Sequence, residues 1–167
     1  MSAYRTADNM LRVTRILGVE TESPTVKTFT FRDRHCIRAR PGQFLMLWIP
    51  GVDEIPLSIL NAEEDGTIVV AVKKVGSATK ALYNMKAGEL IGIRGPFGNW
   101  FTPRRGKILM VGGGTGIAPL LFLAKELTAK AAKIVFVLGA KRKEELLFID
   151  DLREVCSAGN LVATTCL

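Results

Sequence analysis

The sequence has few of the side chains with which most enzymes do chemistry. Its 167 residues include a single histidine, His35, and three widely spaced cysteines, Cys36, Cys156 and Cys166. The cysteines are odd in number and form no CxxC pair, which argues against a disulfide framework and against a cysteine-rich metal site. Histidine-based triads and metal clusters are excluded unless His35 itself takes part. We therefore expect a cytoplasmic protein that holds no metal ion.

Signals for export or membrane insertion are also lacking. Residues 1–10, MSAYRTADNM, have no apolar core of the kind found in secretory signals. Residues 108–124 carry no charge, and a membrane span needs only ~17–25 apolar residues. Three successive glycines and Pro119 interrupt this segment, however, so we interpret it as a strand, a loop and a helix. We expect no membrane partner.

The charge balance is basic, with 23 lysines and arginines against 16 acidic residues and a net charge of +7. A basic surface attracts phosphate groups, whether in nucleic acid or in a nucleotide cofactor. The densest run consists of Arg32, Arg34, Arg38 and Arg40. No aromatic platform follows this run, although proteins that read nucleic acid often interleave the two residue types. We interpret the run as a solvated face and expect no nucleic-acid partner.

Residues up to about 101 form a pattern of short strands separated by turns. Residues 11–19 and 26–31 alternate apolar and polar side chains, as half-buried strands do. Residues 44–49 are continuously apolar, which predicts a strand buried on both faces. Further strands are expected at 55–60, 67–75 and 89–94, the last closed by Gly95-Pro96, with a short helix at 77–85. Many short strands with one helix predict a small antiparallel Greek-key β-barrel.

From residue 104 the pattern changes to alternating strands and helices. Buried strands are expected at 108–111, 134–138 and 161–165, with helices at 117–130 and 144–155. This β-α-β-α-β order implies a parallel sheet with right-handed crossovers. The exposed stretch 102–107 separates the two parts. We therefore predict a β-barrel domain over residues 1–102 and a partial α/β domain over residues 103–167.

A glycine-rich loop lies between the first strand and the first helix of the second part: Gly112, Gly113, Gly114, Thr115 and Gly116. Glycines at this place let backbone N–H groups approach a phosphate at a helix N-terminus. The usual dinucleotide fingerprint fails because its sixth place holds Ile117 rather than glycine, and no P-loop lysine follows. Pro119 fits the first helical turn, where its missing N–H costs nothing. The loop is either a tight turn without a ligand or a nucleotide site, and we favour the site because so many small residues are entropically costly.

The end of the second parallel strand carries Lys141, Arg142 and Lys143. An NAD-specific site usually has an acid there to bind the ribose hydroxyls. Cations suit a 2′-phosphate instead, but they are equally typical of a solvated helix entrance. The choice between NADH and NADPH stays open.

Five short motifs occur in a specific order along the chain. They are RPGQF at 40–44, IPLSI at 55–59, GSATKAL at 76–82, GPFGN at 95–99 and GGGTGIAP at 112–119. In this order they resemble the ferredoxin–NADP reductase superfamily over nearly the whole chain. Residues 41–58 are most similar to the electron-transfer subunits of dihydroorotate dehydrogenase, in particular to their archaeal form.

The resemblance implies an FAD-binding barrel followed by a domain that binds a nicotinamide nucleotide. Electrons would pass from NADH to FAD and, in relatives, through a [2Fe-2S] cluster to an FMN-containing dihydroorotate dehydrogenase catalytic subunit, which is the expected partner in a hetero-oligomer. By position, FAD would be bound by Ile55, Pro56, Leu57, Ser58, Ala71, Val72, Lys73, Gly76, Ala78 and Thr79. The nicotinamide nucleotide would be bound by Gly112, Gly113, Gly114, Thr115, Gly116 and Pro119.

The chemistry of these residues agrees with those roles. The Ser58 hydroxyl can hydrogen-bond a flavin nitrogen or carbonyl, and the first amides of a helix at 77–79 favour a pyrophosphate. Alternatively, Ser58 and Thr79 only cap the local backbone. Because the flavin itself carries the redox chemistry, we expect no catalytic side chain.

The sequence departs from the superfamily at several points. Ile55 stands where relatives usually have an arginine that pairs with the cofactor's phosphates, so Lys73, Lys74 or Lys80 would have to supply that charge. The four cysteines that ligate the cluster in relatives have no counterparts, and a [2Fe-2S] cluster normally takes four thiolates. We therefore expect the isolated chain to bind no cluster. The expected three-stranded sheet also leaves an exposed edge for a partner to cover.

Two further functions stay open on this resemblance. One is a reductase subunit that serves ferredoxin, a hydrogenase or a sulfite reductase. The other is a non-catalytic module that binds flavin or assists assembly, which would not oxidise NADH even with FAD bound.

Overall fold

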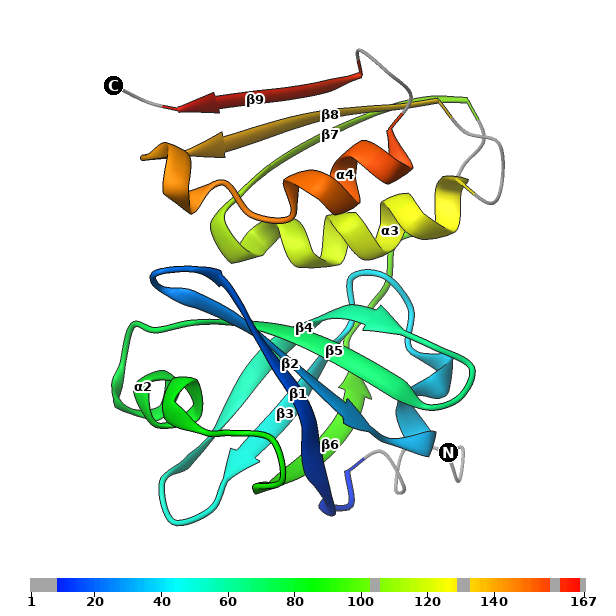
Figure 1. Ribbon diagram of the computed structural model, residues 1–167. Helices are drawn as coiled ribbons and strands as arrows, with labels where there is room; N and C mark the ends of the chain where they lie inside the picture. Colours follow the sequence, from blue (N-terminus) through cyan, green and yellow to red (C-terminus); the bar gives the residue numbers. More distant parts are fainter. Residues whose placement is uncertain (1–8, 103–105, 129–132, 157–159, 166–167) are drawn as a thin grey trace.

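The computed structural model describes residues 9–102, 106–128, 133–156 and 160–165 (Figure 1). Its first part contains β1 (Arg12–Ser23), β2 (Val26–Arg32), the 3-10 helix η1 (Arg34–Arg38), β3 (Phe44–Ile49), β4 (Asp53–Ala62), β5 (Thr67–Lys73), α2 (Ser77–Asn84) and β6 (Leu90–Phe97). The strands pair antiparallel and close into a barrel in the order β1-β2-β5-β4-β3-β6. The predicted antiparallel barrel is therefore confirmed.

The barrel interior is filled by alternate side chains of its strands, and β3 follows this rule. Its Leu45, Leu47 and Ile49 are buried, whereas the residues between them are half-buried. The prediction that this strand is buried on both faces is wrong. On the half-buried face of β3, Trp48 lies so close to Gly92 of β6 that a Cβ on that glycine would come within 2.9 Å of the ring.

Two features of the barrel were not predicted in this form. Gly95 and Pro96 lie inside β6 rather than closing it, because the strand continues to Phe97, which pairs with Phe44 of β3. The 3-10 helix η1 carries part of the arginine run, and it begins where the Asp33 carboxylate accepts the backbone N–H of His35 at 2.8 Å. All four arginines of the run are exposed.

The second part alternates strands and helices. Its elements are β7 (Lys107–Gly113), η2 (Gly114–Ile117), α3 (Ala118–Thr128), β8 (Lys133–Ala140), η3 (Lys143–Glu145), α4 (Ile149–Val155) and β9 (Leu161–Thr165). The three strands are parallel in the order β7-β8-β9. The predicted α/β architecture is confirmed.

Both helices of this part begin later than predicted. The first begins at Ala118, after the turn η2, and residues 129–130 of its predicted end lie outside the described residues. The prediction of one helix over 144–155 is wrong in its first half, where η3 and a non-helical stretch precede α4. Phe148 has a left-handed φ of 57°, and it is buried together with Leu147. Burial of these two side chains outweighs the helical preference of the local sequence.

An apolar interface joins the barrel to the α/β part. Phe122 of α3 belongs to the buried cluster of the barrel, whereas Val26, Leu60 and Ala71 of the barrel belong to the cluster of the α/β part. Figure 1 shows α3 between the barrel and the sheet. The predicted boundary at 102–107 includes residues 103–105, which lie outside the described residues, so the domain division stays a prediction. None of the helices in the described ranges has the length and apolar character needed to cross a membrane.

Candidate functional site

Two neighbouring clefts lie where the barrel meets the α/β part. The first, which we call the β4–β5 cleft, has a volume of about 290 Å³ and is lined by Pro56, Leu57, Ser58, Ala71, Lys73, Val75, Thr79, Thr115 and Ala118. The second, which we call the glycine cleft, has a volume of about 410 Å³ and is lined by Ser23, Thr25, Val26, Lys73, Gly113, Gly114, Gly139, Ala140, Lys141, Glu145 and Leu147. Lys73 lines both clefts, and Lys141 lines the glycine cleft alone.

The β4–β5 cleft brings together six of the residues predicted to contact FAD. Pro56 and Ser58 are exposed on the outer side of β4, with the buried Leu57 between them. The Ser58 hydroxyl forms no hydrogen bond with any residue in the described part of the chain, so it does not cap the local backbone there. It is therefore available to a ligand.

Four other residues predicted to bind FAD do not line this cleft. Val72 is fully buried in the barrel, and Ile55 packs against the barrel core. Gly76 and Ala78 lie at the start of α2, next to the cleft residues Val75 and Thr79 rather than in the lining itself.

The hydroxyl of Thr79 organises the first turn of α2. Its Oγ1 accepts the backbone N–H groups of Val75 at 2.9 Å and Gly76 at 3.0 Å, and donates to the Gly76 carbonyl oxygen at 3.2 Å. Thr79 thus caps the local backbone. The N–H of Lys80 makes the first intrahelical bond, to the Gly76 carbonyl oxygen at 2.9 Å. The N–H groups of residues 77–79 precede that bond and have no partner inside the helix, which leaves them available to an anion.

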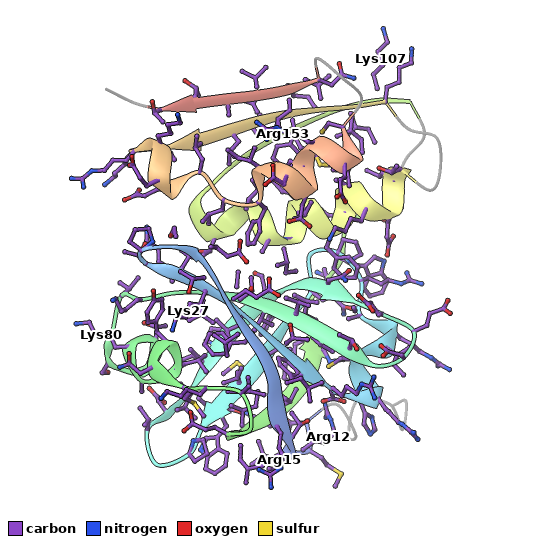
Figure 2. The ribbon with its side chains drawn as sticks, in the orientation of Figure 1. Arg12, Arg15, Lys27, Lys80, Lys107 and Arg153 are labelled. Atoms are coloured by element: carbon purple, nitrogen blue, oxygen red, sulfur yellow. The ribbon has the colours of Figure 1, made fainter. Side chains whose placement is uncertain are left out.

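Of the three lysines expected to replace the missing arginine, Lys73 is the one that lines the β4–β5 cleft. Lys74 instead lies over the ring of Tyr83, 4.5 Å from its centroid. Lys80 points outward from α2 (Figure 2). The structure therefore favours Lys73 as the cation for a bound phosphate.

Packing explains most of the glycines in the loop after β7. A Cβ on Gly113 would lie 2.8 Å from the carbonyl oxygen of Gly139, and one on Gly112 would lie 3.1 Å from a leucine side chain. Gly114 has a left-handed φ of 54°. Gly116 has open space around it and no such φ. A tight turn therefore accounts for three of these glycines, but packing does not explain Gly116.

The loop reaches both clefts. Thr115 lines the β4–β5 cleft, whereas Gly113 and Gly114 line the glycine cleft. The remaining residues predicted to bind a nicotinamide nucleotide line neither cleft: Gly112, Gly116 and Pro119. The loop thus joins the two clefts rather than forming one of them alone.

The glycine cleft also contains residues that the sequence analysis missed. Ser23 and Thr25 come from the turn between β1 and β2, where the Ser23 hydroxyl accepts the N–H of Val26 at 3.1 Å. Glu145 lies in the same lining as Lys141. No local pattern links these residues, because only the tertiary fold brings the β1–β2 turn to the ends of β7 and β8. With both an acid and a cation in the cleft, the choice between NADH and NADPH stays open.

The two cysteines within the described residues are poorly suited to bind a metal. Burial raises the pKa of the Cys156 thiol, which keeps it protonated at neutral pH, whereas metals bind the thiolate. Cys36 lies in the barrel core and Cys156 in the α/β core, and Cys166 lies outside the described residues. Within the described ranges, no group of three or more histidine, cysteine, aspartate or glutamate side chains is placed to hold a metal ion.

Comparisons with known families divide the chain in the same way as the two sheets. Residues 14–101 match the family model described as "Oxidoreductase FAD-binding domain". Residues 110–165 match the family model described as "Oxidoreductase NAD-binding domain". Both clefts are lined by residues from both matched regions.

The chain is also similar to curated proteins named "Probable dihydroorotate dehydrogenase B (NAD(+)), electron transfer subunit". The one from Methanocaldococcus jannaschii is 42% identical over 143 residues, which cover 86% of this chain and 53% of the relative. The one from Methanocella arvoryzae is 40% identical over 144 residues, which cover 86% of this chain and 53% of that relative. The chain thus spans about half the length of these relatives.

Two solved structures show the same fold. The NADH-dependent reduced ferredoxin-NADP oxidoreductase is 31% identical, with a TM-score of 0.79 over 92% of this chain and 56% of that chain. Phthalate dioxygenase reductase is 20% identical, with a TM-score of 0.78 over 93% of this chain and 51% of that chain. At that identity the second likeness shows the fold alone. The predicted likeness to ferredoxin–NADP reductases is confirmed.

Proposed function

Because the chain belongs to the family of oxidoreductases with an FAD-binding domain, we propose that it is an electron-transfer flavoprotein. In this role it takes electrons from NADH or NADPH and passes them through FAD to a partner protein. The observation that carries the proposal is the β4–β5 cleft, where Ser58 and Lys73 of the FAD-binding region meet Thr115 of the NAD-binding region. A cleft shared by the two regions suits the meeting of a hydride donor with a flavin.

The lining of the β4–β5 cleft fits a flavin ring. Pro56, Leu57 and Ala71 offer apolar surface to a flat ring system, and Ser58 offers a free hydroxyl to a ring nitrogen or carbonyl. A bound flavin supplies the redox chemistry, because it accepts a hydride and releases electrons singly. The side chains of the cleft need only hold and orient the ring.

The start of α2 fits the pyrophosphate of FAD. The free N–H groups of residues 77–79 and the positive end of the helix point to an anion. Lys73 adds a full positive charge at the same cleft. Ile55 contributes nothing here, because its side chain packs against the barrel core. Lys73 therefore supplies the charge for which the resemblance implies an arginine at position 55.

The glycine cleft fits the phosphates of the nicotinamide nucleotide. Gly113 and Gly114 have no side chain, so they expose backbone in the wall of this cleft. Lys73 and Lys141 supply positive charge there. Gly116, with open space around it, lets a ligand approach the start of α3. Because Lys73 lines both clefts, we expect the two cofactors to bind side by side.

We further propose that the acceptor is the FMN-containing catalytic subunit of a dihydroorotate dehydrogenase. Support comes from the names of the relatives that are 42% and 40% identical. The [2Fe-2S] cluster expected in relatives does not fit the described cysteines, because Cys36 and Cys156 lie in separate cores.

A ferredoxin is the second candidate acceptor. The sequence of the NADH-dependent reduced ferredoxin-NADP oxidoreductase is 31% identical to this chain, and the match covers 92% of this chain. The two candidates predict the same clefts and differ only in the partner.

The test is an anaerobic visible absorption spectrum of the purified chain reconstituted with FAD, recorded before and after NADH or NADPH is added. Flavin bands that bleach support the proposal. Bands that persist with both nucleotides contradict electron transfer and leave a flavin-binding module. Failure to retain any flavin contradicts the proposal altogether. The reduced protein is then mixed with the dihydroorotate dehydrogenase catalytic subunit or with ferredoxin, and the partner that restores the bands is the acceptor.

A further inference from the structure

The turn between β1 and β2 lies on the side of the barrel that faces the α/β part, and it lines the glycine cleft (Figure 1). Ser23, the last residue of β1, is only 6% exposed. Its hydroxyl oxygen accepts the backbone N–H of Thr25 at 3.3 Å and that of Val26 at 3.1 Å. A serine hydroxyl has two acceptor lone pairs and one hydrogen. The turn therefore occupies both lone pairs, and toward any other group this hydroxyl can only donate.

The hydrogen of the Ser23 hydroxyl has no acceptor among the residues that the structure describes. A buried donor without an acceptor costs free energy, because it has lost its hydrogen bonds to water. Ser23 is almost fully buried, and the small part of it that stays accessible lies in the lining of the glycine cleft. The cleft therefore favours a ligand that brings an acceptor oxygen to this hydroxyl.

Ser23 lies in one row with Val26 and Lys73 across three strands of the barrel. Ser23 pairs with Val26 of β2, and Val26 pairs with Lys73 of β5, both in antiparallel register. Residues that lie directly opposite each other in antiparallel strands share one face of the sheet, with Cα atoms about 4.5–5.5 Å apart. All three line the glycine cleft. The row thus presents a hydroxyl donor and an ammonium group on either side of an apolar valine.

Three further hydrogen bonds hold the β1–β2 turn in this place. The backbone N–H of Lys74 donates to the Thr25 carbonyl oxygen at 2.8 Å, and the Tyr83 hydroxyl donates to the Pro24 carbonyl oxygen at 3.2 Å. The Lys27 ammonium in turn donates to the Tyr83 carbonyl oxygen at 2.9 Å. The turn is therefore fixed against β5 and α2, so little ordering is needed when a ligand binds.

We propose that the Ser23 hydroxyl donates its hydrogen to a phosphate oxygen of the nicotinamide nucleotide, which deepens the proposed function and rests on it. Phosphate oxygens accept hydrogen bonds and carry negative charge, so they suit a hydroxyl donor and an ammonium group in one row. The carboxylate in the lining of this cleft is that of Glu145, which comes from η3 in the α/β part. The barrel side of the cleft, where Ser23 and Lys73 lie, is therefore the side for the phosphate.

Titration of the FAD-saturated chain with NAD⁺ or NADP⁺, followed by calorimetry, tests the proposal without reducing the flavin. Ser23→Ala removes the donor and should weaken binding by about tenfold or more. Ser23→Thr keeps the hydroxyl and should bind like the wild type. Equal affinity in the wild type and Ser23→Ala overturns the role of Ser23 but leaves the proposed function standing. A wild-type chain that binds neither nucleotide contradicts the proposed function, and the role of Ser23 falls with it.

Tyr83→Phe is the matched control for the position of the turn. Ser23→Ala also removes the oxygen that accepts two N–H groups, so a weaker turn has to be separated from a lost donor. Tyr83→Phe removes the hydrogen bond to the Pro24 carbonyl oxygen and leaves the Ser23 hydroxyl in place. Both variants should melt at a slightly lower temperature, but only Ser23→Ala should lose nucleotide affinity. An equal loss of affinity in Tyr83→Phe overturns the proposal.

Inorganic pyrophosphate tests the assignment to a phosphate, because it carries phosphate oxygens without a base, a ribose or a nicotinamide. It should displace the bound nucleotide from the wild-type chain. In Ser23→Ala its own inhibition constant should rise by about tenfold or more, as for the whole nucleotide. Failure to displace the nucleotide from the wild type, or an unchanged inhibition constant in Ser23→Ala, overturns the phosphate as the acceptor.

Discussion

A Cβ atom on Gly113 would lie 2.8 Å from the carbonyl oxygen of Gly139, so the ends of β7 and β8 approach each other more closely than a side chain allows. The two residues lie in the wall of the glycine cleft. The obstructing atom belongs to the backbone, so it cannot move aside as the end of a flexible side chain would. Glycine at 113 is therefore a requirement of strand packing as well as of access to a ligand.

We expect Gly113→Ala to push the two strand ends apart. The cost should be roughly 1–3 kcal/mol, as for other overpacked sites, and the midpoint of thermal unfolding should fall by several degrees. Circular dichroism melting curves measure the change. Titration with NADH should show weaker binding as well, because the wall of the cleft moves.

Gly116→Ala is the matched control for stability, since a Cβ there would have open space around it. Its melting curve should coincide with that of the wild type, but its nucleotide affinity should fall if the start of α3 receives a ligand. Unchanged affinity in Gly116→Ala would show that the loop is a turn and nothing more.

Sequence patterns predicted the structure best where neighbours along the chain decide it. The apolar run at Phe44–Ile49 and the β-branched run at Leu161–Thr165 became β3 and β9 at the predicted bounds. The order of the barrel strands followed by alternating strands and helices was predicted for the same reason. Each element carries its own periodicity and its own turn residues.

Contacts between distant residues account for what the sequence could not show. The pattern at 144–155 is helical, but burial of Phe148 in the α/β core breaks the helix. The second cleft contains Ser23 and Glu145, which come from opposite ends of the chain. No spacing of residues along the sequence indicates that these two side chains line the same cleft. The motif resemblance predicted residues of the β4–β5 cleft because many of them lie near one another in the sequence, along β4 and β5.

Thr79→Val should loosen the first turn of α2. Valine keeps the shape of threonine but loses the oxygen that accepts the N–H groups of Val75 and Gly76. Loss of such a cap costs about 0.5–2 kcal/mol, and we expect FAD affinity to fall with it. Denaturant unfolding and quenching of flavin fluorescence measure the two effects. Thr79→Ser keeps the hydroxyl and should restore both, so a serine variant as weak as valine would contradict the role of the oxygen.

Lys73→Met should weaken the binding of both cofactors, because Lys73 lines both clefts. A hydrogen bond to a charged group contributes about 1.5–3 kcal/mol, which corresponds to a loss of about tenfold or more in each affinity. Lys74→Met is the matched control, since the adjacent Lys74 lies over the Tyr83 ring and lines neither cleft. Equal losses in the two variants would mean that general positive charge, and not the position of Lys73, attracts the cofactors.

Glu22 predicts a pH dependence of stability at the contact between the two parts of the chain. Burial raises its pKa, more than the hydrogen bond from the Thr28 hydroxyl lowers it, and the charges of Glu20 and Asp151 raise the pKa further. The folded state therefore binds the Glu22 proton more tightly than the unfolded state does. Stability should be greatest below the ordinary value of 4.5 and should decline as the pH rises through the raised pKa.

Glu22→Gln should abolish this decline. Glutamine keeps an oxygen for the Thr28 hydroxyl but carries no charge to bury, so the variant should unfold at a higher temperature than the wild type near pH 7. Near pH 4, where the wild-type carboxyl is largely protonated, the two melting curves should converge. Glu64→Gln removes a charge from an exposed position on the β4–β5 turn and should give no such gain at either pH. If Glu22→Gln were less stable than the wild type near neutral pH, the carboxylate would be contributing a favourable interaction across the interface. The expected decline of stability with rising pH would then be contradicted.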